Sequence, residues 1–599
     1  MLLNRRPRAG TPRTPATRRL RRSRFLPLAA LAGSLWAFGC AAPVTLLAPQ
    51  AAPVHQEDLG ETHNEHLRSL AQKARLPPHV VGAGFAGEGI TEAVKGHWNR
   101  ARLGYFGRSE RPYYSGESSP HWPAEAPQSC IAISGGGIRS AAFALGVLQG
   151  LEHQGHLATT DILSSVSGGS YATSWIYSQA LQFDAARRAD PLPHLFAESS
   201  PYLAGLAARA GYFVDTVDGL ANAAAGLVGR PLCAVAAIPA QNTVPRFCGS
   251  HSGYASDIRR MFHDGRRVAP QELRDLLGGT ALPFPVFNAT GRTAPNARCE
   301  GSTDRDENPR PLADSAFEFT PLRHGSDGLG YTAADPRLLD LGHIVGISGA
   351  ALDDPYGKLC QYIAWTGVGL GAFIHGFESA PDLEPRNAGS EIEPRRQRVY
   401  LSDGGFADNL GVFPLVRRLC RRIVVIDSAH DPCLAFTAYQ RLRRALREEM
   451  GVTLSVPEID HLFAANTVPC PAGEECIRTA RQCGRELPED TAFLADQLEH
   501  PVMTGSIAAF PFPDRAPLEL EVVYIKLSLD ADRLATYSST VQRVYAASEH
   551  PTCRKATIGR KCPFPQYSTL DQDYSDLQFR AYRELGAAIV QQSRSLFSP

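Results

Sequence analysis

Short apolar runs alternate with helically spaced apolar residues along much of this chain of 599 residues. Residues 130–133 (CIAI) form one apolar run, and helical spacing of apolar side chains follows over residues 138–151. Further runs that indicate strands lie at 161–166, 285–290, 398–401 and 422–427, and an alternating run at 518–529 indicates an edge strand. This alternation predicts an α/β fold, with a mainly parallel central sheet covered by helices on both faces.

A glycine-rich turn joins the first apolar run to the first helical pattern. Ser134 and three glycines lie between the two, so backbone N–H groups at the start of the helix are expected to lack partners. Such a turn can bind a phosphate or an oxyanion. A P-loop is excluded because no lysine follows the glycines, and a dinucleotide fingerprint would need glycine where Ser140 stands. The oxyanion interpretation is favoured because a serine-centred turn follows.

That serine-centred turn lies at residues 165–171 (SVSGGSY). The strand at 161–166 leads into Ser167, and residues after it can begin a helix, as in the nucleophile elbow of serine hydrolases. The tight turn requires small neighbours, which Gly168 and Gly169 supply. The usual pattern is G-x-S-x-G, and here Ser165 stands at the first glycine position. Ser167 is therefore a candidate nucleophile.

Three ordered motifs carry a resemblance to a known family. SGGGIRS at 134–140, SVSGGS at 165–170 and DGG at 403–405 resemble the patatin-like phospholipases, and within them a bacterial member of the cytosolic phospholipase A type branch. Weaker similarity to bacterial members or to the family's S-x-A-A segment lies at 317–321, 347–351, 568–572 and 578–583. The resemblance implies a patatin-like α/β fold and an acyl-ester hydrolase that uses a Ser–Asp dyad.

The resemblance also implies roles for six residues. It makes Ser167 the nucleophile and Asp403 its base, with oxyanion donors from the glycine turn and a cation beside the oxyanion or the substrate phosphate. A carboxylate base must lie within hydrogen-bond reach of the hydroxyl in a partly desolvated site. The oxyanion and cation positions are Gly135, Gly136, Gly137 and Arg139.

Other residues compete for these roles. Asp408 is a rival acid, and Asp403-Gly404 alone also fits a hairpin turn. Residues 346–350 partly match an elbow but lack a nearby glycine turn, so they are interpreted as structural. A Ser-His-Asp triad would need a histidine, and the candidates are His153, His156, His343, His375 and His430.

Composition excludes some classes of protein. With formal net charge +0, 20% charged and 43% hydrophobic residues, nothing indicates a nucleic-acid-binding protein. Neither H-E-x-x-H nor a paired C-x-x-C occurs, so no catalytic metal is expected, and no cofactor or calcium-binding module is expected either. The expected partners are a phospholipid or lysophospholipid substrate and a membrane surface.

The N-terminus predicts export from a bacterial cytoplasm. Arginines crowd the first 24 residues and a short apolar run follows, which indicates a signal peptide over 1–39. Cys40 stands where a lipoprotein is processed and lipidated, with Ala37 where leucine is usual, and Ala41 fits outer-membrane sorting. The expected location is the cell envelope, on the outer membrane or in the periplasm; an uncleaved anchor and secretion are the alternatives.

The predicted domains are a tether with some helix over 40–125 and a catalytic domain over 126–599, with insertions near 180–280 and 430–515. Apolar stretches at 219–240 and 363–374 are candidates for membrane contact or for buried helices.

Without Cys40, twelve of the 13 cysteines remain, an even number that suits disulfides in an oxidising compartment. Buried free thiols, or a zinc site at 470–483, are the alternatives. Close spacings suggest local disulfides within 233–248, 470–483 and 553–562.

These features together predict a serine acyl hydrolase that cleaves fatty-acyl esters of phospholipids or lysophospholipids through an acyl-enzyme. An acyltransferase would use the same intermediate and pass the acyl group to an alcohol. A catalytically silent lipid-binding envelope lipoprotein is the alternative of a different class, since Ser165 departs from the usual elbow.

Overall fold

A computed structural model gives the fold of this chain. It describes residues 110, 113–114, 126–209, 251–293, 315–326, 330–333, 339–351, 371–378, 396–432, 434–450, 452–469, 475–477, 498, 500–510, 518–530, 532–548, 554–555, 560–561, 564–569, 572 and 574–597. The chain divides into two units, residues 1–42 and 43–599, and every described residue belongs to the second.

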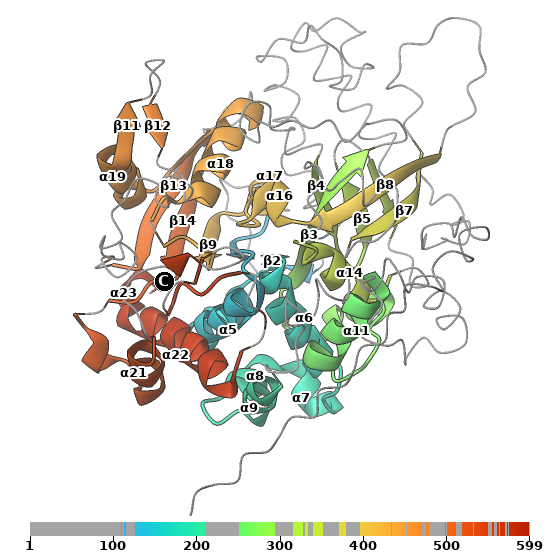
Figure 1. Ribbon diagram of the computed structural model, residues 1–599. Helices are drawn as coiled ribbons and strands as arrows, with labels where there is room; N and C mark the ends of the chain where they lie inside the picture. The colour runs from blue at the N-terminus through green and yellow to red at the C-terminus, as the bar shows by residue number, and fades with distance from the viewer. Residues whose placement is uncertain are drawn as a thin grey trace, which may run out of the picture. The chain divides into compact units, whose positions relative to one another are not determined.

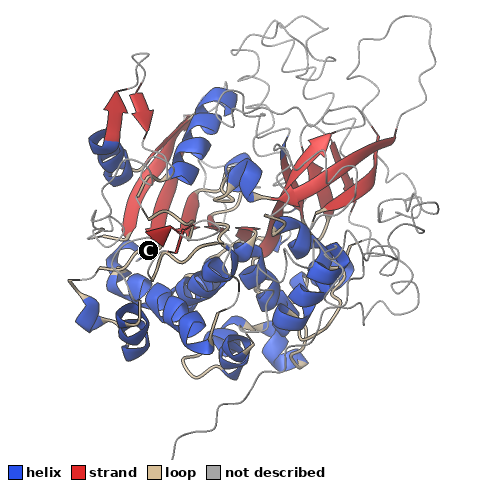
Figure 2. Cartoon of the chain, in the orientation of Figure 1, coloured by secondary structure: helices blue, strands red, loops and turns tan. Residues whose placement is uncertain are grey.

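The centre of the structure is a twelve-stranded sheet (Figures 1 and 2). Its middle strands run parallel in the order β14 (Leu518–Lys526), β9 (Arg422–Asp427), β1 (Ser129–Ile133), β2 (Ile162–Val166) and β3 (Phe284–Thr293). Antiparallel strands extend it beyond β14 as β13 (Val502–Phe510) and β10 (Thr453–Ser455), and beyond β3 as β4 (Ala316–Phe319), β5 (Arg323–Ser326) and β6 (Gly330–Ala333). β8 (Arg396–Asp403) pairs with β3 and with β7 (Ala372–Glu378). The predicted α/β class with a mostly parallel central sheet is confirmed.

One predicted strand lies elsewhere in the sheet. The run at 518–529 was expected at an edge, but β14 lies inside the sheet, parallel to β9 and antiparallel to β13. The edge prediction is therefore wrong. Its cause is β13, a strand not recognised in the sequence, whose pairing covers the side of β14 that would otherwise be free.

Helices cover the central strands, and glycines allow the closest contact between them. α5 (Gly137–His153) packs side by side with α22 (Asp576–Gln592) near the C-terminus (Figure 1). A Cβ at Gly146 would lie 1.8 Å from the carbonyl oxygen of Arg583, and one at Gly586 would lie 2.5 Å from that of Phe143. Since any side chain would push the backbones apart, these glycines set the spacing of the two helices.

The remaining described elements are shorter. The helices are α6 (Gly168–Ala180), α7 (Ala185–Ala189), α8 (Leu192–Phe196), α9 (Pro201–Ala208), α11 (His251–Phe262), α12 (Pro270–Leu277), α14 (Leu341–Ser348), α16 (Gly405–Asp408), α17 (Phe413–Arg417), α18 (Thr437–Ala445), α19 (Pro457–Asn466), α21 (Ser539–Ala546) and α23 (Arg594–Phe597). Single helical turns are η4 (Leu157–Thr159), η6 (Leu446–Met450) and η8 (Leu534–Thr536). Two small hairpins pair β11 (Thr467–Pro469) with β12 (Glu475–Ile477), and β15 (Arg554–Lys555) with β16 (Arg560–Lys561).

β3 acts as a template on which two other strands meet end to end. The last residue of β2, Val166, lies opposite Asn288 of β3. The last residue of β8, Asp403, lies opposite the next residue of β3, Ala289. β4 pairs with β3 over residues that both β2 and β8 also use, so it occupies the other edge of β3. β2 and β8 therefore share one edge, and their carboxyl ends meet one residue apart, about 3.3 Å along β3.

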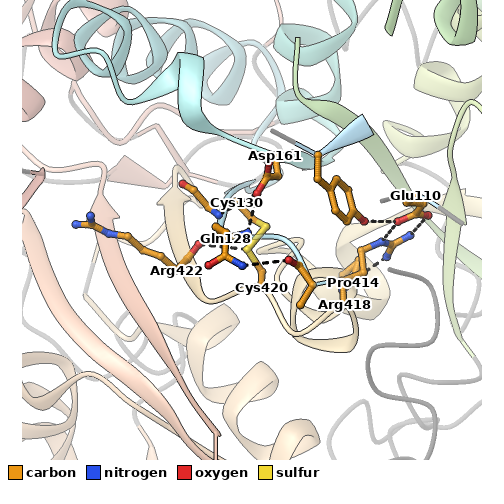
Figure 3. Close-up of a disulfide and its surroundings, with 11 residues drawn as sticks. Glu110, Gln128, Cys130, Asp161, Pro414, Arg418, Cys420 and Arg422 are labelled. Carbon is orange, nitrogen blue, oxygen red and sulfur yellow. Dashed lines mark hydrogen bonds and ion pairs between the residues drawn. A yellow bond between two sulfur atoms is a disulfide. The ribbon is translucent and has the colours of Figure 1, made fainter. Parts of the chain in front are cut away.

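A buried charged cluster ties the β4–β5 hairpin to the rest of the structure, and Figure 3 shows its Glu110 and Arg418. Arg418 donates to Glu110 at 2.6 and 2.9 Å and to Glu318 at 2.9 Å, and its side chain is fully buried. Arg323 and Arg417 also pair with these carboxylates. Burial opposes ionisation of Glu110 and Glu318, but the neighbouring arginines outweigh it and lower the pKa of both carboxyl groups.

A disulfide links two distant parts of the sheet region (Figure 3). It joins Cys130 of β1 to Cys420, just before β9, across 290 residues of sequence, and both cysteines are fully buried. Local disulfides were expected instead. Those cysteines lie outside the described residues, apart from the backbone of Cys476 in β12.

Several expectations fall on residues that the structure does not describe. These are the signal peptide and Cys40, nearly all of the tether, the apolar stretch at 219–240, and residues 363–370 of the second apolar stretch, whose last residues begin β7. Among the residues that are described, no helix is both long and apolar enough to cross a membrane.

Candidate active site

Ser167 lies in a strained turn between β2 and α6. Its backbone has φ 50° and ψ −118°, a conformation that is unfavourable for a non-glycine residue and is found at nucleophile elbows. Only glycine fits next to it, because a Cβ at Gly168 would lie 2.0 Å from the carbonyl oxygen of Gly137. Ser165, at the usual first glycine position, is buried and accepts a hydrogen bond from Ser170 at 3.2 Å. The departure from G-x-S-x-G is therefore accommodated without losing the elbow.

Ser348, the last residue of α14, holds this turn in place. Its hydroxyl accepts a hydrogen bond from the N–H of Ser167 at 2.9 Å and donates one to the carbonyl oxygen of Asn288 in β3 at 2.6 Å. Its own carbonyl oxygen accepts from the N–H of Gly404, directly after Asp403, at 3.2 Å. Ser348 thus contacts both segments of the proposed dyad. Its hydroxyl is buried and engaged, in agreement with the structural interpretation of residues 346–350.

Asp403 lies at the end of β8, beside the elbow. It pairs with Ala289, one residue beyond the point on β3 where β2 ends, and only 5% of it is exposed. Its Oδ1 accepts a hydrogen bond from the N–H of Gly405 at 2.7 Å. Burial, together with the nearby Asp403 charge, raises the pKa of Tyr171 in α6, which places the carboxylate close to this helix. The carboxylate is thus held in the desolvated position expected of a base.

The rival acid Asp408 points elsewhere. Its two oxygens accept hydrogen bonds from the N–H groups of Leu410 and Phe413 at 3.0 and 2.8 Å. Burial raises the pKa of this carboxyl group despite those bonds. Asp408 therefore holds the turn before α17.

The glycine turn approaches the elbow from β1. A Cβ at Gly135 would lie 3.3 Å from the Cβ of Ser167 and 2.4 Å from Oδ1 of Asn409. The N–H of Gly135 is donated to the carbonyl oxygen of Asn409 at 2.9 Å, so it is not free to bind an oxyanion as expected. Gly136 and Gly137 have φ values of 149° and 64°. Within the described part of the chain, no acceptor faces their N–H groups, so these two remain as oxyanion donors.

Arg139 is fully buried in the first turn of α5. Its guanidinium donates to the carbonyl oxygen of Ser428 at 3.0 Å, to Oγ1 of Thr569 at 3.0 Å, and to the carbonyl oxygen of Tyr567. A phosphate or an oxyanion was expected as its partner, but all three nitrogens bond within the protein. Its position corrects that expectation: Arg139 joins the glycine turn to the loop after β9 and to the C-terminal segment.

The C-terminal segment closes over the same turn. Oε1 of Gln572 accepts a hydrogen bond from the N–H of Ile138 at 3.0 Å, and the amide lies against Gly137, where a Cβ would be 2.0 Å from its nitrogen. The resemblance at 568–572 pointed to this segment without indicating its contact. Ser348, Asn409 and Gln572 were missed as site residues because their roles depend on packing between distant segments.

A cavity of about 250 Å³ lies beside the glycine turn. It is lined by Gly135, Gly136, Gly405, Ala407, Asp408, Asn409, Ala429, His430, Thr437, Ala438, Arg441, Leu442 and Thr569. Burial, with the nearby charges of Arg139 and Lys526, lowers the pKa of His430 to about 3, so its imidazole is neutral at neutral pH. No group of three or more metal-ligating side chains occurs among the described residues.

The other candidate histidines have different surroundings. His153 contacts the carbonyl oxygen of Phe196 at 3.0 Å, and the ring of His156 lies tilted against that of Phe597, with the centroids 6.0 Å apart. His343 lies against the Arg259–Asp340 ion pair. The side chain of His375 is outside the described residues. The contacts of His153, His156 and His343 are structural, so they give no support to a triad.

Among solved structures, the chain is similar to human GIVD cytosolic phospholipase A2. The TM-score is 0.48, with 14% sequence identity over 84% of this chain and 66% of that enzyme's chain. The same enzyme in complex with methyl gamma-linolenyl fluorophosphonate gives a TM-score of 0.39 and 16% identity, over 84% and 63% of the two chains. This chain thus spans slightly less than two thirds of that enzyme. No protein-family model and no curated protein matches the sequence, so any functional assignment rests on the chain's own residues.

Proposed function

We propose that this protein is a patatin-like serine acyl hydrolase, acting on fatty-acyl esters of phospholipids or lysophospholipids through Ser167 and Asp403. The observation that carries the proposal is the meeting of β2 and β8 along β3, which brings a strained serine next to a buried carboxylate. The glycine turn that lies against the same serine adds two N–H groups without a partner among the described residues. Nucleophile, base and oxyanion donors are thus in one place.

The reaction proceeds in two halves. Oγ of Ser167 attacks the acyl carbonyl carbon while Asp403 accepts the hydroxyl proton, and the N–H groups of Gly136 and Gly137 stabilise the oxyanion. The tetrahedral intermediate collapses as Asp403 returns the proton to the departing alcohol oxygen, which leaves an acyl-serine. Water then attacks this ester, with Asp403 as the general base, and the fatty acid is released.

Fluorophosphonate labelling of the full chain tests the proposal. An adduct located on Ser167 by peptide mass spectrometry, and absent from Asp403→Asn, is expected. Asparagine keeps an Oδ1 acceptor for the N–H of Gly405 but cannot take a proton, so the fold should persist without the activation. Thermal unfolding of both proteins checks this. A folded chain that takes no label would support the lipid-binding alternative, and a label on another serine would overturn the assignment of Ser167 and Asp403.

An acyltransferase would use the same acyl-enzyme. It differs in that an alcohol acceptor outcompetes water, so product analysis with added lysophospholipid or glycerol separates the two activities.

We also propose that the protein resides in a bacterial cell envelope and is lipidated at Cys40. The support is the arginine-rich and apolar sequence over 1–39 that ends at this cysteine. Metabolic labelling with an alkyne fatty acid in a Gram-negative host should mark the native chain and not Cys40→Ser. Equal labelling of both proteins would argue against lipidation at this residue.

A further inference from the structure

We propose that the cavity beside the glycine turn binds the phosphate of the substrate's headgroup, and that Arg441 of α18 supplies the positive charge. This inference rests on the proposed function and deepens it, by assigning a substrate class to one part of the site. It also replaces Arg139 in the phosphate-binding role that the sequence suggested.

The cavity adjoins the reacting groups. Gly135 and Gly136 form part of its lining, and Gly135 is the residue whose backbone packs against the Cβ of Ser167. Gly405, whose N–H is bonded to Asp403, lines it as well. A group bound there lies next to the ester that Ser167 would attack, which is where the phosphate of a glycerophospholipid must sit.

The size and chemistry of the lining suit a small polar group. A cavity of about 250 Å³ is below the roughly 300–1,000 Å³ of pockets that hold drug-sized ligands. Hydroxyl groups of Thr437 and Thr569 and the amide of Asn409 belong to the lining. These groups can hydrogen-bond a phosphate ester, whereas a long acyl chain would need an apolar channel.

Arg441 is the cation available to this cavity. It is the single arginine or lysine among the lining residues that the structure describes, and its side chain is exposed. Arg139 is less suited to the role, because it is fully buried, is not among the described lining residues, and already donates from all three nitrogens within the protein. His430 also lines the cavity but carries no charge at neutral pH. Guanidinium groups bind phosphate oxygens in pairs, which suits an arginine at the rim.

The neighbours of Arg441 anchor its helix, and no carboxylate of the described residues forms an ion pair with it. Tyr439 and Leu442 are buried and anchor α18, while Arg443, two residues on, pairs with Asp460 at 2.8 Å. Asp408 contributes the carboxylate of the lining, and its oxygens are bonded to backbone N–H groups on the other side of the turn.

Binding of phosphate compounds tests the inference independently of hydrolysis. Calorimetry with sn-glycerol 3-phosphate should detect binding to the full-length Ser167→Ala chain, weakened about ten- to a hundredfold by adding Arg441→Gln, as for loss of a charged hydrogen bond. Arg444→Gln, an exposed arginine on the same helix outside the lining, is the matched control and should bind like the parent. Inorganic phosphate as a second probe separates a site for a phosphate ester from one for free phosphate. No binding, or equal binding by all variants, overturns the inference.

Substrate preference gives a second readout. The ratio of kcat/KM for a lysophospholipid to that for an uncharged monoacylglycerol should fall about tenfold or more in Arg441→Gln and stay constant in Arg444→Gln. An unchanged ratio in an active enzyme refutes the headgroup site and leaves the hydrolase standing. Arginine-dependent binding of glycerol phosphate by a chain that takes no fluorophosphonate label would refute the hydrolase and leave the phosphate site standing.

Discussion

At the scale of single residues, the site depends on hydroxyl and amide groups that do no chemistry themselves. Ser348 bonds to the N–H of Ser167 and, through its carbonyl oxygen, to Gly404 beside Asp403. Asn409 accepts the N–H of Gly135, and Gln572 accepts that of Ile138. These bonds fix the strained serine and the glycine turn relative to each other, so the site is organised before substrate arrives.

Replacing Ser348 by alanine should therefore slow the reaction without unfolding the protein. The N–H of Ser167 would lose its buried acceptor, at a cost of about 1–3 kcal/mol, and the elbow could relax. We expect the rate of fluorophosphonate labelling at Ser167 to fall about tenfold or more. Ser174→Ala is the matched control, since among the described residues its buried hydroxyl on α6 bonds within that helix, to the carbonyl oxygen of Tyr171. Equal slowing by both substitutions would mean that Ser348 has no special positioning role.

Candidate residues with a local signature could be proposed from the sequence, and contacts with distant partners could not. Ser167 was proposed as nucleophile because an elbow needs small residues directly around it, and Asp403 as base because two glycines follow it in a motif of the resembling family. Arg139 was placed in the correct turn, yet its partners come from residues 428 and 567–569, which no local pattern reveals. An oxyanion role was expected for Gly135 for the same reason, because the bond from its N–H to the distant carbonyl oxygen of Asn409 leaves no local pattern.

At the scale of elements, the fold is a parallel core extended by antiparallel strands on both sides. The parallel strands were predictable because burial on both faces makes them nearly continuous apolar runs, as in β1 and β9. β4 and β5 were harder to recognise, since they carry charged side chains. Glu318 and Arg323 belong to the buried cluster that contains Arg417 and Arg418 of the segment before β9.

Glu318→Gln should destabilise the fold in a pH-dependent way. At neutral pH the change leaves Arg417 and Arg418 beside one fewer buried carboxylate, and we expect a loss of about 3–5 kcal/mol in the free energy of unfolding. The pKa of Glu318 is lowered in the folded state from an ordinary value of 4.5, so its contribution is complete above that pH and is lost as pH falls below it.

Urea unfolding at several pH values checks this prediction. The difference between wild type and Glu318→Gln should shrink as pH falls from 4.5 toward the lowered pKa. Glu521→Gln is the control, because its pair with Arg422 at 3.3 Å is largely exposed and should contribute about 0–1 kcal/mol. A difference between wild type and Glu318→Gln that is small at neutral pH, or that grows in acid, would contradict the role of the cluster.

At the scale of the whole molecule, the chain is closed by contacts between segments far apart in sequence. The Cys130–Cys420 disulfide spans 290 residues, and α22 near the C-terminus packs on α5. Close spacing of other cysteines suggested only local disulfides, because a long-range pair leaves no spacing signal in one sequence. β13 was not predicted from the sequence either, and β14 was therefore expected at an edge.

Removing this disulfide should lower stability by about 2–5 kcal/mol, since the cross-link restricts a long loop in the unfolded chain. The Cys130→Ala/Cys420→Ala double variant is compared with wild type by urea unfolding under oxidising conditions. Peptide mapping of the wild type confirms the bond. With reductant present, the unfolding midpoints of the two proteins should become nearly equal. The remaining difference is the effect of replacing two cysteine side chains by alanine. An unchanged unfolding midpoint without reductant would show that the bond adds no stability.

The meeting of two strands on β3 also has a consequence for when the protein becomes active. Ser167 and Asp403 come from strands more than two hundred residues apart, and each is placed by pairing with the same third strand. The oxyanion turn is completed later still, by Thr569 and Gln572 near the C-terminus. A chain still emerging from the ribosome would therefore hold no working site. Under the proposed function, a hydrolase able to attack membranes would stay silent in the cell that makes it until synthesis is finished.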